Sequence, residues 1–225
     1  MLESFSVTEK PLLVLASNSP RRRQLLSLAG WKFTVSAANV DESVFSNESP
    51  SAYVLRLAET KARAIRADAE QVVLAADTTV VNGTEILGTP NDGAEATAML
   101  KRLRGRTHQV YTGIALFRPR DGLLLKDLCV TDVPMREYSD DEIDAYVKTG
   151  DPLDKAGAYA IQHPEFKPVA QMEGCFASVM GLPVCHVIRL MRTMGLQPDT
   201  AFFLGCETLL EYRCPVSSAI LNGEM

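Results

Sequence analysis

Residues 12–30, LLVLASNSPRRRQLLSLAG, constrain the fold most, because they predict a buried strand that leads directly into a helix. Residues 12–16 form a short apolar run that is typical of a core strand. Ser19 is suited to cap the helix, Pro20 fits its first position, and Gly30 is suited to end it. A tight polar loop therefore connects the two predicted elements.

Arg21, Arg22 and Arg23 lie in the first turn of this predicted helix, where free N–H groups and the helix dipole already create positive potential. One interpretation is that the three side chains extend into solvent and pair with surface carboxylates. The other is that they bind an anion such as phosphate together with the preceding loop, SNS at 17–19. We favour the anion site, because hydroxyls, helix cap and basic cluster fall in one loop.

The formal net charge of −5 argues against a general attraction to nucleic acid or to an anionic membrane. A small anionic ligand agrees better with a local basic cluster. No apolar segment reaches the roughly 20 residues of a membrane span, and residues 1–10 do not resemble a secretion signal, so we expect a cytoplasmic protein. Five cysteines without a CxxC pair favour reduced thiols over disulfides or a zinc site.

A lysine falls on the apolar side of the second predicted helix. Ser49 and Pro50 predict its start, and its apolar stripe includes Val54, Leu57, Ala58 and Ile65. Lys61 falls in the same stripe. Its ammonium group either reaches water from the edge of the stripe or borders a polar cavity that needs a cation.

Residues 71–77, QVVLAAD, predict a strand that ends in Asp77 between two apolar runs. An unpaired buried carboxylate is costly, so Asp77 must meet a metal, a cation or hydrogen-bond donors. It is therefore the best catalytic candidate among the acidic residues. Asp41 and Glu42 lie in a Ser- and Asn-rich loop, where they are either solvated charges or a second acidic part of the site.

The rest of the chain predicts one mixed-sheet α/β domain over residues 11–196. A tight turn at Asn82 and Gly83 indicates a hairpin. The other predicted elements are a helix at 92–104, antiparallel strands at 108–117 and 123–133, a helix from Ser139 to Thr149, a strand at 171–180 and a helix from Pro183 to about 194. Residues 1–10 are expected to be loose, and residues 197–225 to be an extension with a short helix at 201–212.

Seven short segments together resemble the Maf family of nucleotide pyrophosphatases, in order and over most of the chain. These segments are SNSPRR at 17–22, DE at 41–42, ETKA at 59–62, AADTTVV at 75–81, GRTHQVYTG at 105–113, DKAGAYAIQ at 154–162 and GLP at 181–183.

The resemblance implies a mixed twisted sheet with flanking helices, related to the inosine triphosphate pyrophosphatases, with two lobes around a cleft and often a homodimer. It also implies metal-dependent hydrolysis of a nucleoside triphosphate to a nucleoside monophosphate and pyrophosphate. Mg²⁺ or Mn²⁺ is the expected cofactor, with Co²⁺ as a further candidate.

The resemblance also implies roles for individual residues. Asp77 matches the family's catalytic aspartate, and Glu42 and Lys61 match a polar pair in the cleft. Asp77 either accepts a proton or holds the metal with Glu42. The residues expected to bind the substrate are Ser17, Arg21, Arg22, Thr78, Lys155 and Gln162. Of these, Arg21, Thr78 and Gln162 match the trio that marks the branch acting on dTTP and UTP.

Two departures from the family pattern are visible. Thr89 stands where the family has a lysine before a proline, so a cation is lost unless Lys155 replaces it. HPEFKP at 163–168 replaces a glycine-rich turn. The alternative function is therefore a nucleotide-binding regulatory protein with weak hydrolysis. A purely structural partner in cell division is a third reading, which no residue supports.

Overall fold

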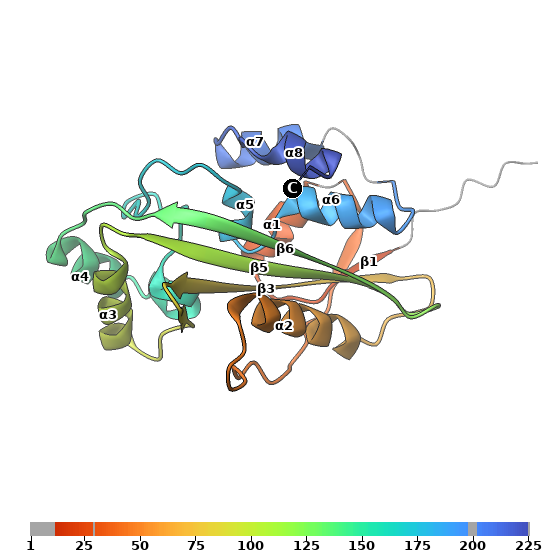
Figure 1. Ribbon diagram of the computed structural model, residues 1–225, viewed down its shortest axis with the longest axis horizontal. Helices are drawn as coiled ribbons and strands as arrows, with labels where there is room; N and C mark the ends of the chain where they lie inside the picture. The colour runs from red at the N-terminus through yellow and green to blue at the C-terminus, as the bar shows by residue number, and fades with distance from the viewer. Residues whose placement is uncertain (1–11, 29, 198–201, 225) are drawn as a thin grey trace, which may run out of the picture.

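A six-stranded mixed sheet is the centre of the computed structural model, which describes residues 12–28, 30–197 and 202–224 (Figure 1). Its strand order is β2-β1-β3-β5-β6, with β4 paired to β3. β1 pairs in parallel with β2 and β3, and the other pairs are antiparallel. The strands are β1 (Leu13–Leu15), β2 (Phe33–Val35), β3 (Val72–Asn82), β4 (Glu85–Leu87), β5 (Thr107–Arg118) and β6 (Leu123–Pro134).

Helices cover both faces of this sheet. α2 lies on one side, α6, α7 and α8 lie on the other, and α3 and α4 lie together at one end of the long strands (Figure 1). The helices are α1 (Pro20–Ser27), α2 (Pro50–Ala64), α3 (Gly93–Leu103), α4 (Asp140–Lys148), the 3₁₀ helices η1 (Asp151–Asp154) and η2 (Ala156–Ala158), α5 (Phe176–Val179), α6 (Val184–Thr193), α7 (Phe202–Leu210) and α8 (Ser217–Asn222). None of the described helices is long and apolar enough to cross a membrane.

The predicted mixed-sheet α/β class and the predicted helix starts are confirmed. Ser19 Oγ accepts a hydrogen bond from the Arg22 backbone N–H, and Ser49 caps α2 in the same way. Ser139 and Glu142 form the reciprocal capping box of α4. Each cap satisfies N–H groups that have no partner within the helix, and it fixes where the helix begins.

One edge of β3 is interrupted, and this interruption creates the opening for a site. β1 pairs with the first part of β3, up to Leu74, and β4 pairs with its last part, from Val80. Between them, residues 75–79 face no strand of the described chain on that edge, while β5 pairs along the opposite edge. Asp77 and Thr78 lie in this gap, and their side chains point to opposite faces of the sheet because they are neighbours in a strand.

The prediction that the strand ends at Asp77 is therefore wrong. β3 continues through β-branched residues to Asn82, because β5 pairs with it from Val73 to Val81. Asp77 consequently lies in the middle of a strand.

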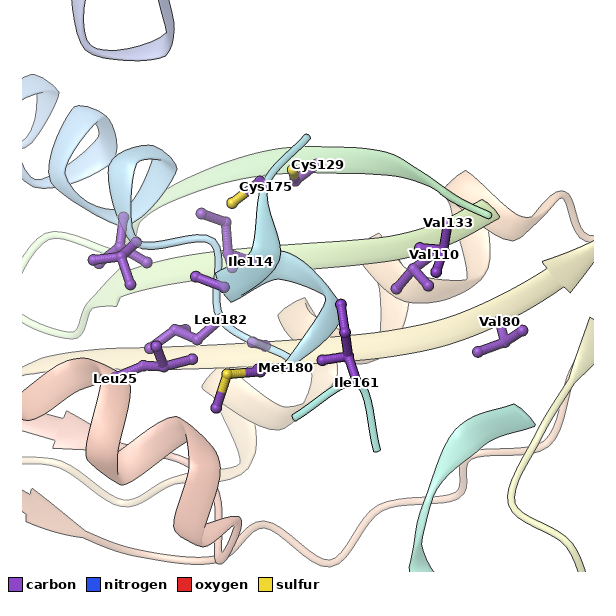
Figure 2. Close-up of a cluster of buried hydrophobic side chains, with 14 of the residues drawn as sticks. Leu25, Val80, Val110, Ile114, Cys129, Val133, Ile161, Cys175, Met180 and Leu182 are labelled. Atoms are coloured by element: carbon purple, nitrogen blue, oxygen red, sulfur yellow. The ribbon is translucent and has the colours of Figure 1, made fainter. Parts of the chain in front are cut away.

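The larger part of the core lies on the face covered by α1, α5 and α6. Figure 2 shows some of it, with Leu182, which follows α5, next to Leu25 of α1, and with Val110 of β5 next to Val133 of β6. On the other face, small side chains from α2, β3 and β5 form a second, thinner cluster. This thin layer lets α2 lie close to the sheet.

Gly113 of β5 makes the closest approach of α2 possible. It lies opposite Asp77 in the strand register, and a Cβ atom at this position would lie 2.6 Å from the Val54 carbonyl oxygen. Lys61 follows Val54 on α2. The glycine therefore controls how near the lysine comes to Asp77.

The predicted strand at 171–180 is also wrong. Residues 176–179 form the short helix α5, which packs on the face of β5 and β6 rather than beside an edge strand. Periodicity cannot separate a short buried strand from a short buried helix. The extension contains α7, as predicted, and also α8, which packs on α6 and which no sequence signal indicated. The predictions for residues 1–10 and for the helix start at Ala201 lie outside the described residues.

We expect Gly113→Ala to lower the free energy of unfolding by about 2 kcal/mol, because the new methyl group must push α2 away from β5. Chemical denaturation monitored by circular dichroism measures this change. Gly88→Ala is the matched control, since a Cβ atom at Gly88 meets nothing within 4 Å. Equal stability of the two variants would contradict the close packing at Gly113.

Candidate active site

A cavity of about 230 Å³ opens at the interrupted edge of β3 and receives side chains from both faces of the sheet. It lies between the loop that precedes α1, the helix α2, and the segment from η1 to Gly181. Eight of the predicted site residues line it: Arg21, Arg22, Glu42, Lys61, Asp77, Thr78, Lys155 and Gln162. The remaining one, Ser17, lies behind Arg22 and contacts it.

On the α2 face, Lys61 connects two carboxylates. Its Nζ lies 2.6 Å from Asp77 Oδ1 and 2.8 Å from Glu42 Oε1. Only 8% of Lys61 and 5% of Asp77 are exposed, so both charges are buried and paired. Lys61 therefore does not extend its ammonium into bulk water: the structure supports the reading in which the apolar stripe borders a polar cavity.

The pKa of Asp77 is raised above its ordinary value, because burial disfavours the charged form. The charges of Lys61 and Arg22 oppose this shift, and the nearby Glu42 adds to it. The result is a carboxylate that binds a proton more readily than a solvated aspartate does. This property suits a group that receives a proton during a reaction.

On the opposite face, Arg22 is held by three hydrogen bonds. Its Nε donates to the Gly181 carbonyl oxygen at 2.8 Å, its Nη1 donates to Ser17 Oγ at 3.3 Å, and its Nη2 donates to Thr78 Oγ1 at 3.3 Å. Burial lowers the pKa of Arg22, and the negative charge of Asp77 counteracts this. The guanidinium group is thus fixed in place before any ligand enters.

Gly181 has to be a glycine for this contact. Its φ angle is +106°, and a Cβ atom would lie 3.3 Å from Arg22 Nε. The GLP motif at 181–183 therefore has a physical role in holding the arginine.

A second group of charges lies across the cavity. Lys155 Nζ is 2.9 Å from Asp151 Oδ1 and 2.6 Å from Asp154 Oδ1, and only 7% of Lys155 is exposed. Arg21 Nη1 lies 3.9 Å from Asp154 Oδ2. Arg23 is exposed outside the cavity. The arginine cluster therefore divides, with two members at the cavity and one in solvent.

Thr89 and Gln162 are exposed residues of the cavity wall. Lys155 lines the same cavity as Thr89 and supplies a cation to it. That cation is already compensated by two carboxylates.

Sequence reasoning missed two residues that position this site. Tyr53 Oη donates to the Glu42 backbone oxygen at 2.9 Å and holds the acidic loop near α2; burial raises the pKa of this tyrosine to about 12. Thr112 of β5 bonds to Thr78 from a fully buried position. Thr112 lies in the quoted segment GRTHQVYTG, and its membership of this segment was the available signal.

The three histidines do not line the cavity. His108 is buried and hydrogen-bonds Tyr159 Oη through Nε2 at 2.8 Å, and burial lowers its pKa to about 4. It is therefore neutral at pH 7 and packs as part of the core.

Asp77 and Glu42 offer the donor set for a metal ion. Among the described residues, no three or more His, Cys, Asp and Glu side chains are grouped to hold one. Each of these carboxylates contacts the Lys61 ammonium group through one oxygen, and its second oxygen is the candidate metal ligand. Two carboxylates fit a hard divalent cation whose other ligands are phosphate oxygens and water.

We expect Lys61→Met to raise the pKa of Asp77 further, because the substitution removes the main opposite charge while burial remains. Carboxyl-carbon NMR titration of the folded variant measures this pKa. Lys155→Met is the control, because its ammonium pairs with Asp151 and Asp154 instead. A pKa of Asp77 that is the same in Lys61→Met and in the wild type would contradict the described pairing.

The family comparison and the curated relatives agree with one another. The family described as Maf-like protein matches residues 12–194. A dTTP/UTP pyrophosphatase of Myxococcus xanthus is 48% identical over 190 residues, which cover 84% of this chain and 95% of the relative. A protein of the same name from Geobacter metallireducens is 47% identical over 189 residues, which cover 83% of this chain and 98% of that relative.

Solved structures overlap less well. A HAM1 protein from Coxiella burnetii is 17% identical, with a TM-score of 0.40 over 55% of this chain and 72% of that protein, which is too low to establish a shared fold. The family match and the curated relatives, by contrast, span most of the sequence. On that evidence, the chain belongs to the Maf family.

Proposed function

We propose that this protein is a nucleoside triphosphate pyrophosphatase that prefers dTTP and UTP and releases a nucleoside monophosphate and pyrophosphate. The main structural support is that Asp77, Lys61 and Arg22 converge on one cavity. The relatives named dTTP/UTP pyrophosphatase, at 47–48% identity, supply the reaction and the substrates.

In this proposal the triphosphate contacts the arginines of α1 and Lys155 in the cavity. Arg21 and Arg22 lie in the first turn of α1, where the helix N-terminus also favours negative charge, and Lys155 lines the same cavity. Ser17 supports the group by holding Arg22. The bound phosphates are thus neutralised locally in a chain whose net charge is −5.

Asp77 is the proposed proton acceptor or metal ligand. Water attacks phosphorus in line, the bond between the α and β phosphates breaks, and pyrophosphate leaves. The proton of the water passes to a base, and the raised pKa of Asp77 suits that role. Lys61 holds Asp77 in place, and its charge favours the ionised carboxylate because it opposes the effect of burial.

Asp77 and Glu42 would hold the divalent cation, Mg²⁺ or Mn²⁺, with Co²⁺ as a further candidate. When bound, the cation neutralises phosphate charge and lowers the pKa of bound water. Lys61 holds the two carboxylates close to each other, because its ammonium group contacts one oxygen of each.

In this proposal Arg21, Thr78 and Gln162 recognise the base. All three line the cavity, and hydrogen-bonding groups discriminate strongly because a missing partner is costly. Pyrimidine triphosphates with a uracil or thymine base are the expected substrates.

We also propose the division into a domain over 11–196 and an extension over 197–225. It agrees with a family match that ends at residue 194 and with α7 and α8 packing on α5 and α6. We further propose that the protein is cytoplasmic and forms a homodimer. We propose no nucleic-acid partner and no membrane partner.

We expect Asp77→Asn to lower the rate of pyrophosphate release from dTTP by about 10³-fold, because the amide neither accepts a proton nor holds a cation as a carboxylate does. A coupled pyrophosphate assay measures the rate, and thermal unfolding shows whether the variant folds. Asp140→Asn is the matched control, since Asp140 pairs with Lys101 and Arg104 away from the cavity. A folded Asp77→Asn protein with undiminished turnover would remove Asp77 from the mechanism.

For the wild-type protein we expect faster hydrolysis of dTTP and UTP than of dATP and 7-methyl-GTP, with loss of activity on chelation and recovery with Mg²⁺, Mn²⁺ or Co²⁺. Chromatography identifies the products, and monophosphate plus pyrophosphate distinguishes this reaction from stepwise removal of phosphate. A purine triphosphate ranked first would contradict the base preference. Tight triphosphate binding with negligible turnover in every metal would instead favour the regulatory alternative.

A further inference from the structure

A segment without regular structure carries Glu42 to the cavity. Residues 36–49, which connect β2 to α2, form no helix and no strand, and Glu42 is the residue of this segment that lines the cavity. Its side chain is 54% exposed, although its carboxylate lies 2.8 Å from Lys61 Nζ. An ion pair with so exposed a partner contributes little on its own. The position of Glu42 therefore depends on contacts that the rest of the segment makes with the fold.

Arg56 of α2 makes a set of such contacts. Its Nε and Nη2 donate to the two carboxylate oxygens of Glu48, at 2.6 and 2.7 Å, and Nη2 also donates to the Ser43 backbone oxygen at 3.0 Å. Its guanidinium carbon lies 3.8 Å from the centre of the Phe45 ring. A planar guanidinium group suits this task, because it binds a carboxylate through two bonds and also stacks on a ring. One side chain thus contacts three residues of the segment.

Glu48 completes this set of contacts. Its Oε2 also accepts a hydrogen bond from the Phe45 backbone N–H at 3.1 Å, and its side chain is only 8% exposed. The hydrogen bonds from Arg56 lower the pKa of Glu48, so the carboxylate is ionised at pH 7. Arg56 itself does not line the cavity. Its charge is therefore neutralised by the segment and is not offered to the phosphates.

Tyr53 adds a second attachment at Glu42 itself. Its Oη donates to the Glu42 backbone oxygen at 2.9 Å, and it shares a side of α2 with Arg56 because the two residues are three positions apart. Tyr53 thus holds the backbone of Glu42, and Arg56 holds the residues that follow it. Without Arg56, this one hydrogen bond would have to oppose the conformational entropy of the segment.

We infer that Arg56 is a positioning residue that holds residues 43–48 against α2 and thereby keeps the Glu42 carboxylate at the cavity. Arg56 does not line the cavity, so its effect on the reaction passes through Glu42. The expected effect on turnover rests on the proposed function, because that function assigns Glu42 to the metal ion. The attachment of the segment to α2 does not rest on it.

The test is a double-mutant cycle between Arg56 and Glu42. We expect Arg56→Met to lower kcat/KM for dTTP about tenfold in the wild-type background, as loss of a residue that orients a metal ligand commonly does. In the Glu42→Gln background the same substitution should change kcat/KM by less than about twofold, since the carboxylate that Arg56 positions is already gone. Arg63→Met is the matched control, because Arg63 lies on the same helix and its described partners, Glu59 and the Phe117 ring, lie outside the segment.

A second measurement needs no nucleotide and reports on Glu42 directly. A glutamate-specific protease cleaves after Glu42 only when this side chain leaves Lys61 and enters the protease. We therefore expect cleavage at this position to be about tenfold faster in Arg56→Met than in the wild type or in Arg63→Met. Mass spectrometry identifies the cleavage site, and thermal unfolding shows whether each variant is folded.

Unchanged kcat/KM in folded Arg56→Met protein would overturn the inference, as would an equal fall in both backgrounds or an unchanged rate of cleavage after Glu42. Should Arg56→Met not fold, Glu48→Gln gives the same test from the other side of the ion pair, with the same expected changes. If the wild-type protein hydrolyses neither dTTP nor UTP, the proposed function fails, and the cleavage rates alone decide whether Arg56 holds Glu42 at the cavity.

Discussion

The interruption between β1 and β4 along one edge of β3 is the constraint on which the site depends. A continuous edge would bury the β3 backbone behind a neighbouring strand and would keep the two faces of the sheet apart. Because the edge is open, one cavity receives Lys61 and Glu42 from one face and Arg22 from the other. Binding sites of α/β proteins commonly lie where strand connectivity opens such a crevice beyond a strand's carboxyl end, and here the chain leaves β1 at that point.

The electrostatics follow from burial. Lys61 and Asp77 would each be costly alone in the interior, and together they form a pair that retains Glu42 at the cavity mouth. Across the cavity, Lys155 is compensated by Asp151 and Asp154 in a similar way. The cavity thus contains fixed charges of both signs at short range. Such an arrangement favours a ligand that brings its own negative charge and a counter-ion.

Local signals in the sequence were sufficient for part of this architecture. Caps at Ser19, Ser49 and Ser139 predicted the helix starts because each cap acts within one turn. The apolar stripe of α2 predicted that Lys61 lies on the core-facing side of the helix, but it left open whether the ammonium group reaches water or a polar cavity. Strand pairing is not local, so the length of β3 and the gap beside Asp77 could not be predicted. The short apolar run at 176–179 was ambiguous for the same reason, because its partners are distant in sequence.

Asp77 and Thr78 are neighbours on one strand whose side chains serve opposite faces, so their separate tasks depend on a single strand register. A slip of one residue would turn the carboxylate toward Arg22 and the hydroxyl toward Lys61. A one-residue insertion or deletion within β3 would exchange the two faces, whereas the same change in a surrounding loop would not. The pairing of β3 with β5 over nine successive positions guards against such a slip, so the strand alignment preserves the chemistry of both faces.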